Sequence, residues 1–231
     1  MIVRFLNLTE RKRKKLLNKI KPTTLNKSYI NYLKTPLADL KNNIENIEFL
    51  ALDFETTGLD PNNDSILSVG YTIISNNKIK LKENGHHIVR LDTQLNEGNV
   101  VVHQITDNRM QQGEDLLNVI NTLLDRLCGR VLLVHFENIE KSFLNAVCKK
   151  LFGGILPVHI VDTMKIEHKK LSRTKPWIKG EDLRLFNIRS GYKLPRYKAH
   201  SALEDAISTA ELFLLQMEKN GAKNITLKDI I

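Results

Sequence analysis

A short apolar segment at residues 47–54, with the sequence IEFLALDF, constrains the fold of this chain more than any other feature. A continuous apolar run of this length, bounded by polar residues, is typical of a strand that is buried on both faces. Two further strand-like segments, residues 66–75 and 78–82, follow it along the chain. Asn76-Asn77 between them is a sequence that favours a tight turn. These segments predict the centre of a sheet whose first strands form an antiparallel meander.

Helical and strand patterns alternate in the remainder of the chain. Apolar residues at helical spacing predict an amphipathic helix over residues 116–127. By the same patterns, the further elements expected are strands at residues 130–135 and 157–161, and helices at residues 137–151, 180–190 and 201–219. Strands joined through helices pair in parallel as crossover units. The prediction is an α/β fold with a mixed five-stranded sheet, an antiparallel meander plus parallel strands, and helices on both faces; residues 86–91 have the pattern of a further edge segment.

The basic charge of the chain is concentrated near its N-terminus. The formal net charge is +9, and residues 1–46 hold 11 Lys and Arg against 3 Asp and Glu, whereas residues 47–231 hold 24 against 23. We therefore predict a basic N-terminal helical extension over residues 1–46, with a short helix at residues 10–21, and a main domain over residues 47–231. Such an excess attracts nucleic-acid phosphates or an anionic membrane surface, and a solvated helical face explains it equally well. We expect the extension to pack as a helix on the main domain and to add basic surface.

The cysteines and the hydropathy pattern narrow the cellular setting. Cys128 and Cys148 lie 20 residues apart, which matches neither a disulfide framework nor a zinc site. No apolar run reaches the roughly 18 residues that a membrane span needs. The N-terminus runs from apolar to basic, which is the opposite order to a secretory signal. We expect a cytoplasmic protein without a membrane partner.

Asp53 and Glu55 are the first residues with the pattern of a chemical site. They lie two apart at the end of the predicted strand over residues 47–54, so that both side chains point to the same face. Two adjacent carboxylates repel each other unless a cation lies between them, and oxygen ligands alone suit Mg²⁺ or Mn²⁺. Taken alone, such a pair is more often a solvated turn than a metal site.

Asp205 is a second acidic candidate, at the start of the helix predicted over residues 201–219. The inner face of that helix carries small residues, which permit a close approach to the sheet and would direct Asp205 toward the strand end. His200 lies just before the helix, and a histidine titrates near neutral pH, as suits a base that takes a proton from water. The alternative is that His200 only forms a hydrogen bond near the helix start.

A third acidic candidate comes from residues 134–144, VHFENIEKSFL. Glu140 lies near the start of the helix predicted there, and Glu137, one turn earlier, is a competing candidate. With nothing else known, two surface glutamates are an equally good interpretation. The sequence leaves both possibilities open.

Taken together, these segments resemble the DEDDh branch of the DnaQ-like 3′-to-5′ exonucleases, which have a ribonuclease H-like fold. The resemblance covers roughly residues 47–219. It rests on D-F-E-T-T-G-L-D-P at residues 53–61 and on H-x-A-x-x-D at residues 200–205, both of which are highly specific. Between them, V-H-x-I-T at residues 102–106 and D-T at residues 162–163 match further family segments.

One motif departs from the family pattern, which is H-N-x-x-F-D. His135 matches the histidine, but Phe136 stands for the asparagine. Ile139 replaces the phenylalanine, and Glu140 replaces the aspartate. A glutamate keeps the charge and adds a methylene, so Glu140 is assigned to the metal-binding role. Ser201 occupies the place of the tyrosine that defines the sister branch.

The resemblance implies two-metal hydrolysis of a nucleic acid with a free 3′ end, most simply single-stranded DNA. It implies that two divalent ions, Mg²⁺ or Mn²⁺, are held by Asp53, Glu55, Glu140 and Asp205, that His200 takes the proton from the attacking water, and that nucleoside monophosphates are released. The expected substrate contacts are Thr56, Thr57, Gly58, Leu59, His103, Phe143, Arg196 and Lys198.

Basic residues before His200 suggest that this part of the chain binds the phosphates of the substrate and guides the strand. One group comprises Arg189, Lys193, Arg196 and Lys198, and a second comprises Lys169, Lys170, Arg173, Lys175 and Lys179, with Trp177 among them. An aromatic residue among lysines suits single-stranded nucleic acid, and core packing explains Trp177 equally well.

Two rival interpretations of the whole chain remain open. The altered motif around Glu140 is compatible with a non-catalytic nucleic-acid-binding module on the same fold. An RNA-trimming exoribonuclease would carry the same carboxylates. The resemblance also leaves open whether the chain works with a polymerase, in proofreading, or with repair proteins.

Overall fold

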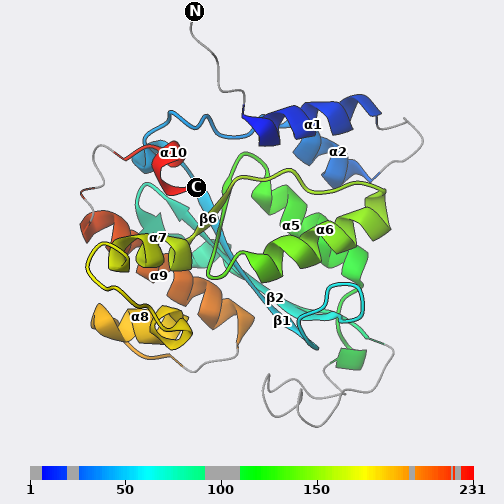
Figure 1. Ribbon diagram of the computed structural model, residues 1–231. Coiled ribbons are helices and arrows are strands. Elements are labelled where there is room, and N and C mark those ends of the chain that lie inside the picture. The colour runs from blue at the N-terminus through cyan, green and yellow to red at the C-terminus, as the bar shows by residue number, and fades with distance from the viewer. Residues whose placement is uncertain (1–6, 20–25, 92–109, 198–200, 220, 222–224) are drawn as a thin grey trace, which may run out of the picture.

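The computed structural model describes residues 7–19, 26–91, 110–197, 201–219, 221 and 225–231. Figure 1 shows a twisted sheet at the centre of the molecule with helices on its two faces. The strands are β1 (Phe49–Thr56), β2 (Ile66–Ser75), β3 (Lys78–Ile79), β4 (Gly85–Ile88), β5 (Val131–Val134) and β6 (Ile160–Asp162).

The sheet is mixed, as predicted. Its order is β3-β2-β1-β5-β6, with β4 pairing on β2. β1 and β2 are antiparallel, whereas β1–β5 and β5–β6 are parallel. The described chain therefore forms six strands, and the strand beyond the predicted five is β4, within the edge segment noted at residues 86–91. β3 is shorter than predicted because the chain turns at Lys80 into the 3-10 helix η2 (Leu81–Glu83).

The helices follow the predicted order. They are α1 (Leu8–Lys19), α2 (Lys27–Lys34), η1 (Ile44–Asn46), α5 (Leu116–Leu127), α6 (Asn138–Phe152), α7 (Thr163–Leu171), η3 (Gly180–Leu183), α8 (Leu185–Gly191), α9 (Ala202–Lys219) and α10 (Leu227–Ile230). The expected helix over residues 180–190 is broken into η3 and α8, and neither α2 nor α10 was predicted. No helix in the described ranges is long and apolar enough to cross a bilayer.

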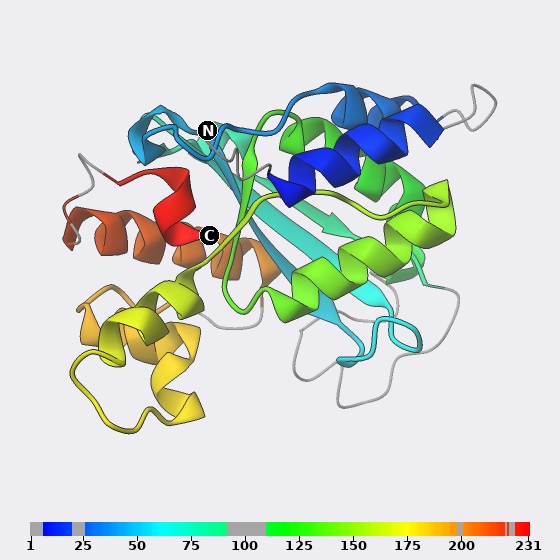
Figure 2. The ribbon, with the colours of Figure 1, turned by 45° about the horizontal axis from the view of Figure 1, so that its top comes forward.

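Both faces of β1 are buried, which explains its continuous apolar sequence. Leu50 and Leu52 belong to a cluster with α5 and α6, whereas Phe49 and Ala51 belong to a second cluster that includes Phe213 of α9. Figure 2 shows α5 and α6 on one side of the sheet and α9 on the other. Alternation along β1 therefore sends odd-numbered side chains toward α9.

The N-terminal arm packs on the main body, as predicted. Tyr32 and Leu33 of α2 lie in the same core cluster as Leu50. The Tyr32 hydroxyl donates to the carbonyl of Pro157 at 2.8 Å. Arg13 of α1 is only 4% exposed and donates to the carbonyl of Leu33, so the helix that carries most of the basic residues is joined to α2. α1 and α2 thus cover one end of the core beside α5 and α6.

Candidate active site

β1 positions the first two carboxylates. Asp53 and Glu55 continue the odd-numbered row of Phe49 and Ala51, so they face α9. The register of β1 against β2 shifts between Glu55 and Thr56, so the pairing is irregular at the end of the strand, as at a bulge. Bulges commonly redirect the chain next to functional sites, and here the strand leaves the sheet directly after the carboxylates.

Gly70 allows α9 to approach the sheet closely. It lies opposite Asp53 in the register of β1 and β2, and a Cβ atom at this position would be 2.1 Å from the carbonyl carbon of Ala202. Ala202 and Ala206 of α9 are completely buried, as the small inner face of the helix predicted. The sequence interpretation missed Gly70, although a glycine inside a strand is a known sign of close backbone approach.

As a result, three carboxylates meet above the end of β1. Oxygen atoms of Asp53, Glu55 and Asp205 all lie within 4.8 Å of one another. Carboxylates at this separation can coordinate a shared divalent cation, which prefers oxygen ligands.

Glu140 approaches this group from the start of α6. It is 3% exposed, and its negative charge contributes to the raised pKa of Asp53, although it lies outside the group of three. Within the described part of the chain, its Oε2 atom has no hydrogen-bond partner. A buried carboxylate oxygen without a donor is costly and indicates that a cation or a donor completes it.

Glu137, the competing candidate, has a different environment. It forms ion pairs with Lys165 at 2.9 Å and with Lys141 at 3.1 Å. Partial burial opposes its ionisation, but hydrogen bonds from the two lysines lower the pKa of Glu137 overall. The geometry therefore favours Glu140 over Glu137 as the fourth carboxylate.

The electrostatics of the four carboxylates suit a cation. Burial, reinforced by the charge of Asp205, raises the pKa of Glu55 to about 7. Burial raises the pKa of Glu140 to about 8, and the charge of Asp162 adds to the effect. Burial also raises the pKa of Asp53 well above its ordinary value, followed by the charge of Glu140. Divalent cations would remove this penalty by replacing protons, so the residues present fit a metal centre.

The loop after β5 shows the backbone conformation of the altered motif. Phe136 has a φ of 76°, in the left-handed region, where asparagine is tolerated far better than an aromatic residue. The backbone N–H groups of Phe136 and Glu137 donate to the Asp162 carboxylate at 3.1 and 3.0 Å. His135 donates from Nε2 to the carbonyl of Leu183 at 2.9 Å, and burial lowers its pKa. His135 and Asp162 thus hold the loop that leads to Glu140.

The predicted nucleotide-binding segment after β1 is organised by its own side chains. The Thr56 hydroxyl donates to the carbonyl of Gly58 at 2.7 Å, and the Thr57 hydroxyl donates to Asp64 at 3.0 Å. Leu59 is 76% exposed at the tip. Asp64 also accepts from the N–H of Asp60 at 2.9 Å, so it shapes the loop, a role that the sequence interpretation missed.

Other predicted substrate contacts have different positions. Phe143 is 1% exposed and lies in the core beneath the site, so it offers no surface to a nucleotide, in contrast to the prediction. Arg196 is exposed. His103, Lys198 and His200 lie outside the described residues.

Arg189 was grouped with the phosphate-guiding residues, and this interpretation is wrong because Arg189 is 1% exposed. It pairs with Glu211 of α9 at 2.8 Å and donates to the carbonyl of Pro195 at 2.9 Å. The Tyr197 hydroxyl donates to Glu211 as well, also at 2.8 Å. Arg189 and Glu211 therefore anchor the segment that leads toward residue 200. A sequence alone cannot separate such a buried arginine from a surface one.

A mixed sheet and two flanking helix starts thus bring three carboxylates within 4.8 Å of one another, with the buried Glu140 interacting with Asp53, in an arrangement that can hold divalent cations. A family model agrees with this arrangement: the model described as Exonuclease, RNase_T, matches residues 50–213. The chain belongs to this exonuclease family, which confirms the resemblance seen in the sequence.

Curated relatives are much longer proteins. The chain is 27% identical over 194 residues to a DNA polymerase III PolC-type protein of Thermotoga petrophila, which covers 81% of this chain and 14% of that protein. It is 24% identical over 171 residues to the 3′-5′ exonuclease DinG of Staphylococcus aureus, covering 74% and 18%. The chain thus spans less than a fifth of the length of these relatives.

Solved structures share the fold. Exonuclease X in complex with 5′ overhanging duplex DNA has a TM-score of 0.60 at 21% identity, over 79% of this chain and 96% of that one. The nuclease domain of 3′hExo, a DEDDh family member bound to rAMP, has a TM-score of 0.63 at 14% identity, over 84% and 98%. These similarities confirm the predicted fold class.

Proposed function

We propose that this chain removes nucleotides from the 3′ end of single-stranded DNA by two-metal-ion hydrolysis and releases nucleoside monophosphates. The observation that carries the proposal is the meeting of Asp53, Glu55 and Asp205 within 4.8 Å, on a chain of the exonuclease family. The partnerless Oε2 atom of Glu140 supports it, since the described residues supply that atom no donor.

Asp53, Glu55, Glu140 and Asp205 would hold two divalent ions, Mg²⁺ or Mn²⁺. Bound there, such ions stabilise the charge that develops on a phosphate and lower the pKa of a water. The Asp53 carboxyl interacts with the charges of all three other acids, and it would serve both ions. Glu140, on the α6 side, would face the second ion. The carboxylates keep these positions because β1, α6 and α9 are each fixed by the core.

His200 is proposed as the base that takes the proton from the attacking water. In the sequence His200 precedes the first residue of α9, the helix that carries Asp205, by two positions. Arg189 and Glu211 hold the preceding segment, up to Tyr197, against α9. An imidazole that is neutral near pH 7 can accept a proton and later release it to solvent.

The 3′ terminal nucleotide would be held by the loop after β1. Main-chain groups of Thr56, Thr57 and Gly58 would bind its hydroxyl and sugar, and the exposed side chain of Leu59 would contact its base. His103, Arg196 and Lys198 are proposed to contact phosphates. A site that binds a free 3′ hydroxyl explains why hydrolysis would start at an end.

DNA is the proposed substrate because the chain is similar to a DNA polymerase III PolC-type protein, and a similarity to the 3′-5′ exonuclease DinG supports exonuclease action. A polymerase or repair partner is proposed on the same ground. We also propose that residues 47–231 form the exonuclease domain and residues 1–46 a basic helical extension. The free cysteines Cys128 and Cys148 fit a reducing cytoplasm, which we propose as the location.

The test is digestion of matched single-stranded DNA and RNA, each labelled at the 5′ end and, separately, at the 3′ end. With Mg²⁺ or Mn²⁺, the 5′-labelled DNA is expected to give a ladder that shortens stepwise, and the 3′-labelled DNA is expected to release labelled mononucleotide at once. Faster RNA digestion would reassign the substrate. Binding without digestion under every metal condition would identify a non-catalytic binding module instead.

A further inference from the structure

Trp177 is the most exposed large hydrophobic residue of the described chain. Its side chain is 88% exposed, and it is the one tryptophan in the sequence. The structure therefore excludes the core-packing interpretation of this residue. An indole carries a large apolar surface beside a polar N–H group, so an exposed indole is free to stack on a ligand.

The surroundings of Trp177 are strongly basic. Residues 163–197 contain ten Lys and Arg against three acidic residues, in a chain whose net charge is +9. Two of those acids are engaged: Glu167 is buried beside Lys170, and Asp182 accepts from the backbone N–H of Lys179. Lys165 and Arg189 form ion pairs with acids outside the segment, and Arg189 is buried. The segment nevertheless keeps a net positive charge, which exposed residues such as Arg173 and Lys179 carry.

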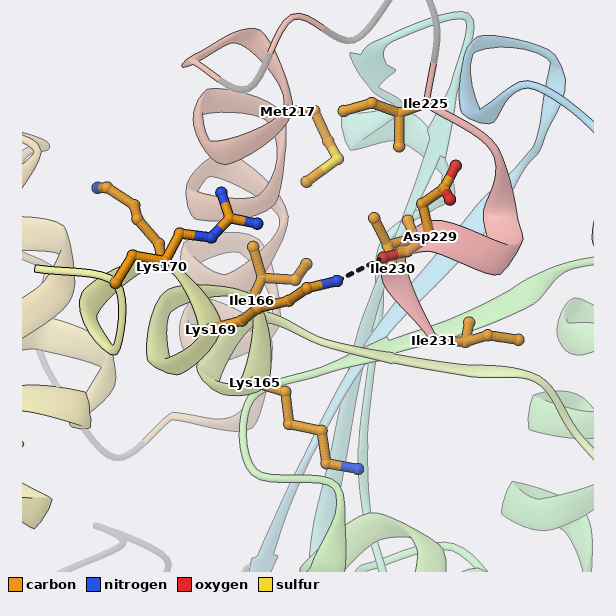
Figure 3. Close-up of a pocket in the computed structure, with 10 residues that line it drawn as sticks. Lys165, Ile166, Lys169, Lys170, Met217, Ile225, Asp229, Ile230 and Ile231 are labelled. Atoms are coloured by element: carbon orange, nitrogen blue, oxygen red, sulfur yellow. Dashed lines mark hydrogen bonds between the residues drawn. The ribbon is translucent and has the colours of Figure 1, made fainter.

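The basic row begins on α7 and continues to Trp177. Figure 3 shows Lys165, Lys169 and Lys170 along α7, where with Arg173 they line a pocket of about 310 Å³. After α7, residues 172–177 are all exposed. Figures 1 and 2 both show this connection between α7 and η3 at the edge of the molecule, beside α8 and away from the sheet.

The segment is nevertheless tied to the catalytic side of the fold. Three residues after η3 begins, Leu183 accepts a hydrogen bond from His135, in the loop that leads to Glu140. The backbone N–H of Lys179 and the Lys175 ammonium group both lie near Asp182, at 3.3 and 3.9 Å. Trp177 is thus presented between two lysines on a connection of defined structure.

We propose that Trp177, flanked by Lys175 and Lys179, is a second binding site for single-stranded DNA outside the catalytic centre. The indole would stack on a base, and the two lysines would bind the phosphates beside it. Stacking on an aromatic ring does not depend on which base is present, so the contact would be indifferent to sequence. This inference rests on the proposed function, because it supplies a contact for the strand that enters the nuclease site.

Tryptophan fluorescence tests the proposal directly, since the tryptophan emission of the chain comes from Trp177 alone. The full chain is titrated with a thymidine 20-mer in chelator, which prevents hydrolysis, while binding is followed in parallel by the anisotropy of a dye on the same strand. The expected result is quenching of the emission with the same midpoint as the anisotropy change. Binding without quenching would overturn the proposal but leave the nuclease assignment intact.

Variants add a second readout. Trp177→Ala is expected to weaken binding of the 20-mer by about 5- to 100-fold, and Trp177→Phe to retain most of the affinity. Lys175→Gln with Lys179→Gln is expected to reduce the slope of log affinity against log salt by about 1.4, or about 0.7 for each phosphate that a lysine no longer neutralises.

The matched control is Lys78→Gln with Lys82→Gln, which removes the same charge from exposed residues of β3 and η2. It is expected to leave both affinity and slope unchanged. If the two double variants have equal effects, the effect of Lys175 and Lys179 comes only from the net charge of the chain. That result would overturn the part of the proposal that concerns the two lysines. Failure of the 20-mer to bind the unaltered chain at all would overturn the binding site, and the digestion ladder would show independently whether the nuclease assignment fails with it.

Discussion

Four carboxylates whose charges act on one another set the electrostatics of the candidate site at the scale of single residues. Asp53, Glu55 and Asp205 share one group, and Glu140 adds its charge from α6. Without a cation, each additional ionised carboxylate raises the free energy of the folded chain because like charges repel in a medium that solvates them poorly. The folded protein must therefore bind protons or metal ions at this place.

Stability should consequently fall with rising pH in the absence of metal. The folded-state pKa of Glu55 is about 7 and that of Glu140 about 8, against an ordinary value of 4.5. A raised carboxyl pKa contributes stability below the unfolded value, and that contribution is lost as the pH rises through the folded value. For Glu55 the loss is on the order of 3 kcal/mol. Thermal unfolding in chelator from pH 5 to 9 should show this decline.

Two comparisons accompany that measurement. Mg²⁺ should restore stability at the alkaline end, because metal binding replaces the protons. Glu55→Gln should flatten the pH dependence. Melting temperatures that stay constant from pH 5 to 9 in chelator would show that the carboxylates are not buried together.

Phe136 stores backbone strain at the edge of the site. Its φ of 76° is unfavourable for a residue with a bulky side chain. We expect Phe136→Asn to raise the free energy of unfolding by about 1 kcal/mol, measured by urea denaturation, because asparagine tolerates this conformation. Phe136→Ala removes the ring but keeps the strained Cβ, so it should give no such gain. If both variants raise the free energy of unfolding equally, removal of the phenylalanine ring, and not relief of backbone strain, causes the effect.

At the scale of elements, the site depends on how closely α9 lies on β2. Gly70 sits opposite Asp53 and beneath the first residues of α9. The helix can therefore bring Asp205 to the carboxylates of β1. The distance between α9 and the sheet can be this short because Gly70 of β2 has no side chain and the facing residues of α9 are alanines.

Gly70→Ala should therefore impair hydrolysis although it replaces none of the four carboxylates. The added Cβ would lie 2.1 Å from backbone atoms of Ala202, so α9 must move. We expect hydrolysis to fall by about 100-fold, since a shift of about 1 Å is enough for this. Gly191→Ala is the matched control, because a Cβ there would meet nothing within 4 Å. Unimpaired hydrolysis by Gly70→Ala would contradict the role of close packing.

The sequence was informative where a pattern has one physical cause. The apolar run of β1 and the helical spacing of α5 each identified their element correctly, because burial produces those patterns directly. β4 was noted only as an edge segment because it is four residues long and only partly buried. The burial of Arg189 depends on Glu211, 22 residues away, which no local pattern reveals.

At the scale of the whole molecule, the arm and the main body share one core. Tyr32 and Leu33 of α2 are 1% and 0% exposed, within the cluster that also contains Leu50 of β1. The arm therefore contributes apolar burial as well as basic charge. A second concentration of basic residues, at 163–197, lies within a main body that is close to neutral in total.

Leu33→Ala should accordingly destabilise the whole protein. Removing a fully buried leucine side chain costs about 2–5 kcal/mol, and the loss should appear in the main unfolding transition of the chain. Lys15→Ala, at an exposed position of α1, should have little effect. A main transition that is unchanged by Leu33→Ala, monitored by circular dichroism, would show that the arm folds separately.

The most direct test of the nuclease account is the rate at which Asp53→Asn shortens 5′-labelled single-stranded DNA in Mn²⁺, measured beside the unaltered chain. Asp53 lies within 4.8 Å of both other acids of the group of three, and asparagine keeps its size while removing its charge. We predict a loss of at least about 100-fold with strand binding retained, and no shortening by either protein in chelator. Equal shortening by the two proteins, or shortening that persists in chelator, would contradict metal-dependent hydrolysis at these carboxylates.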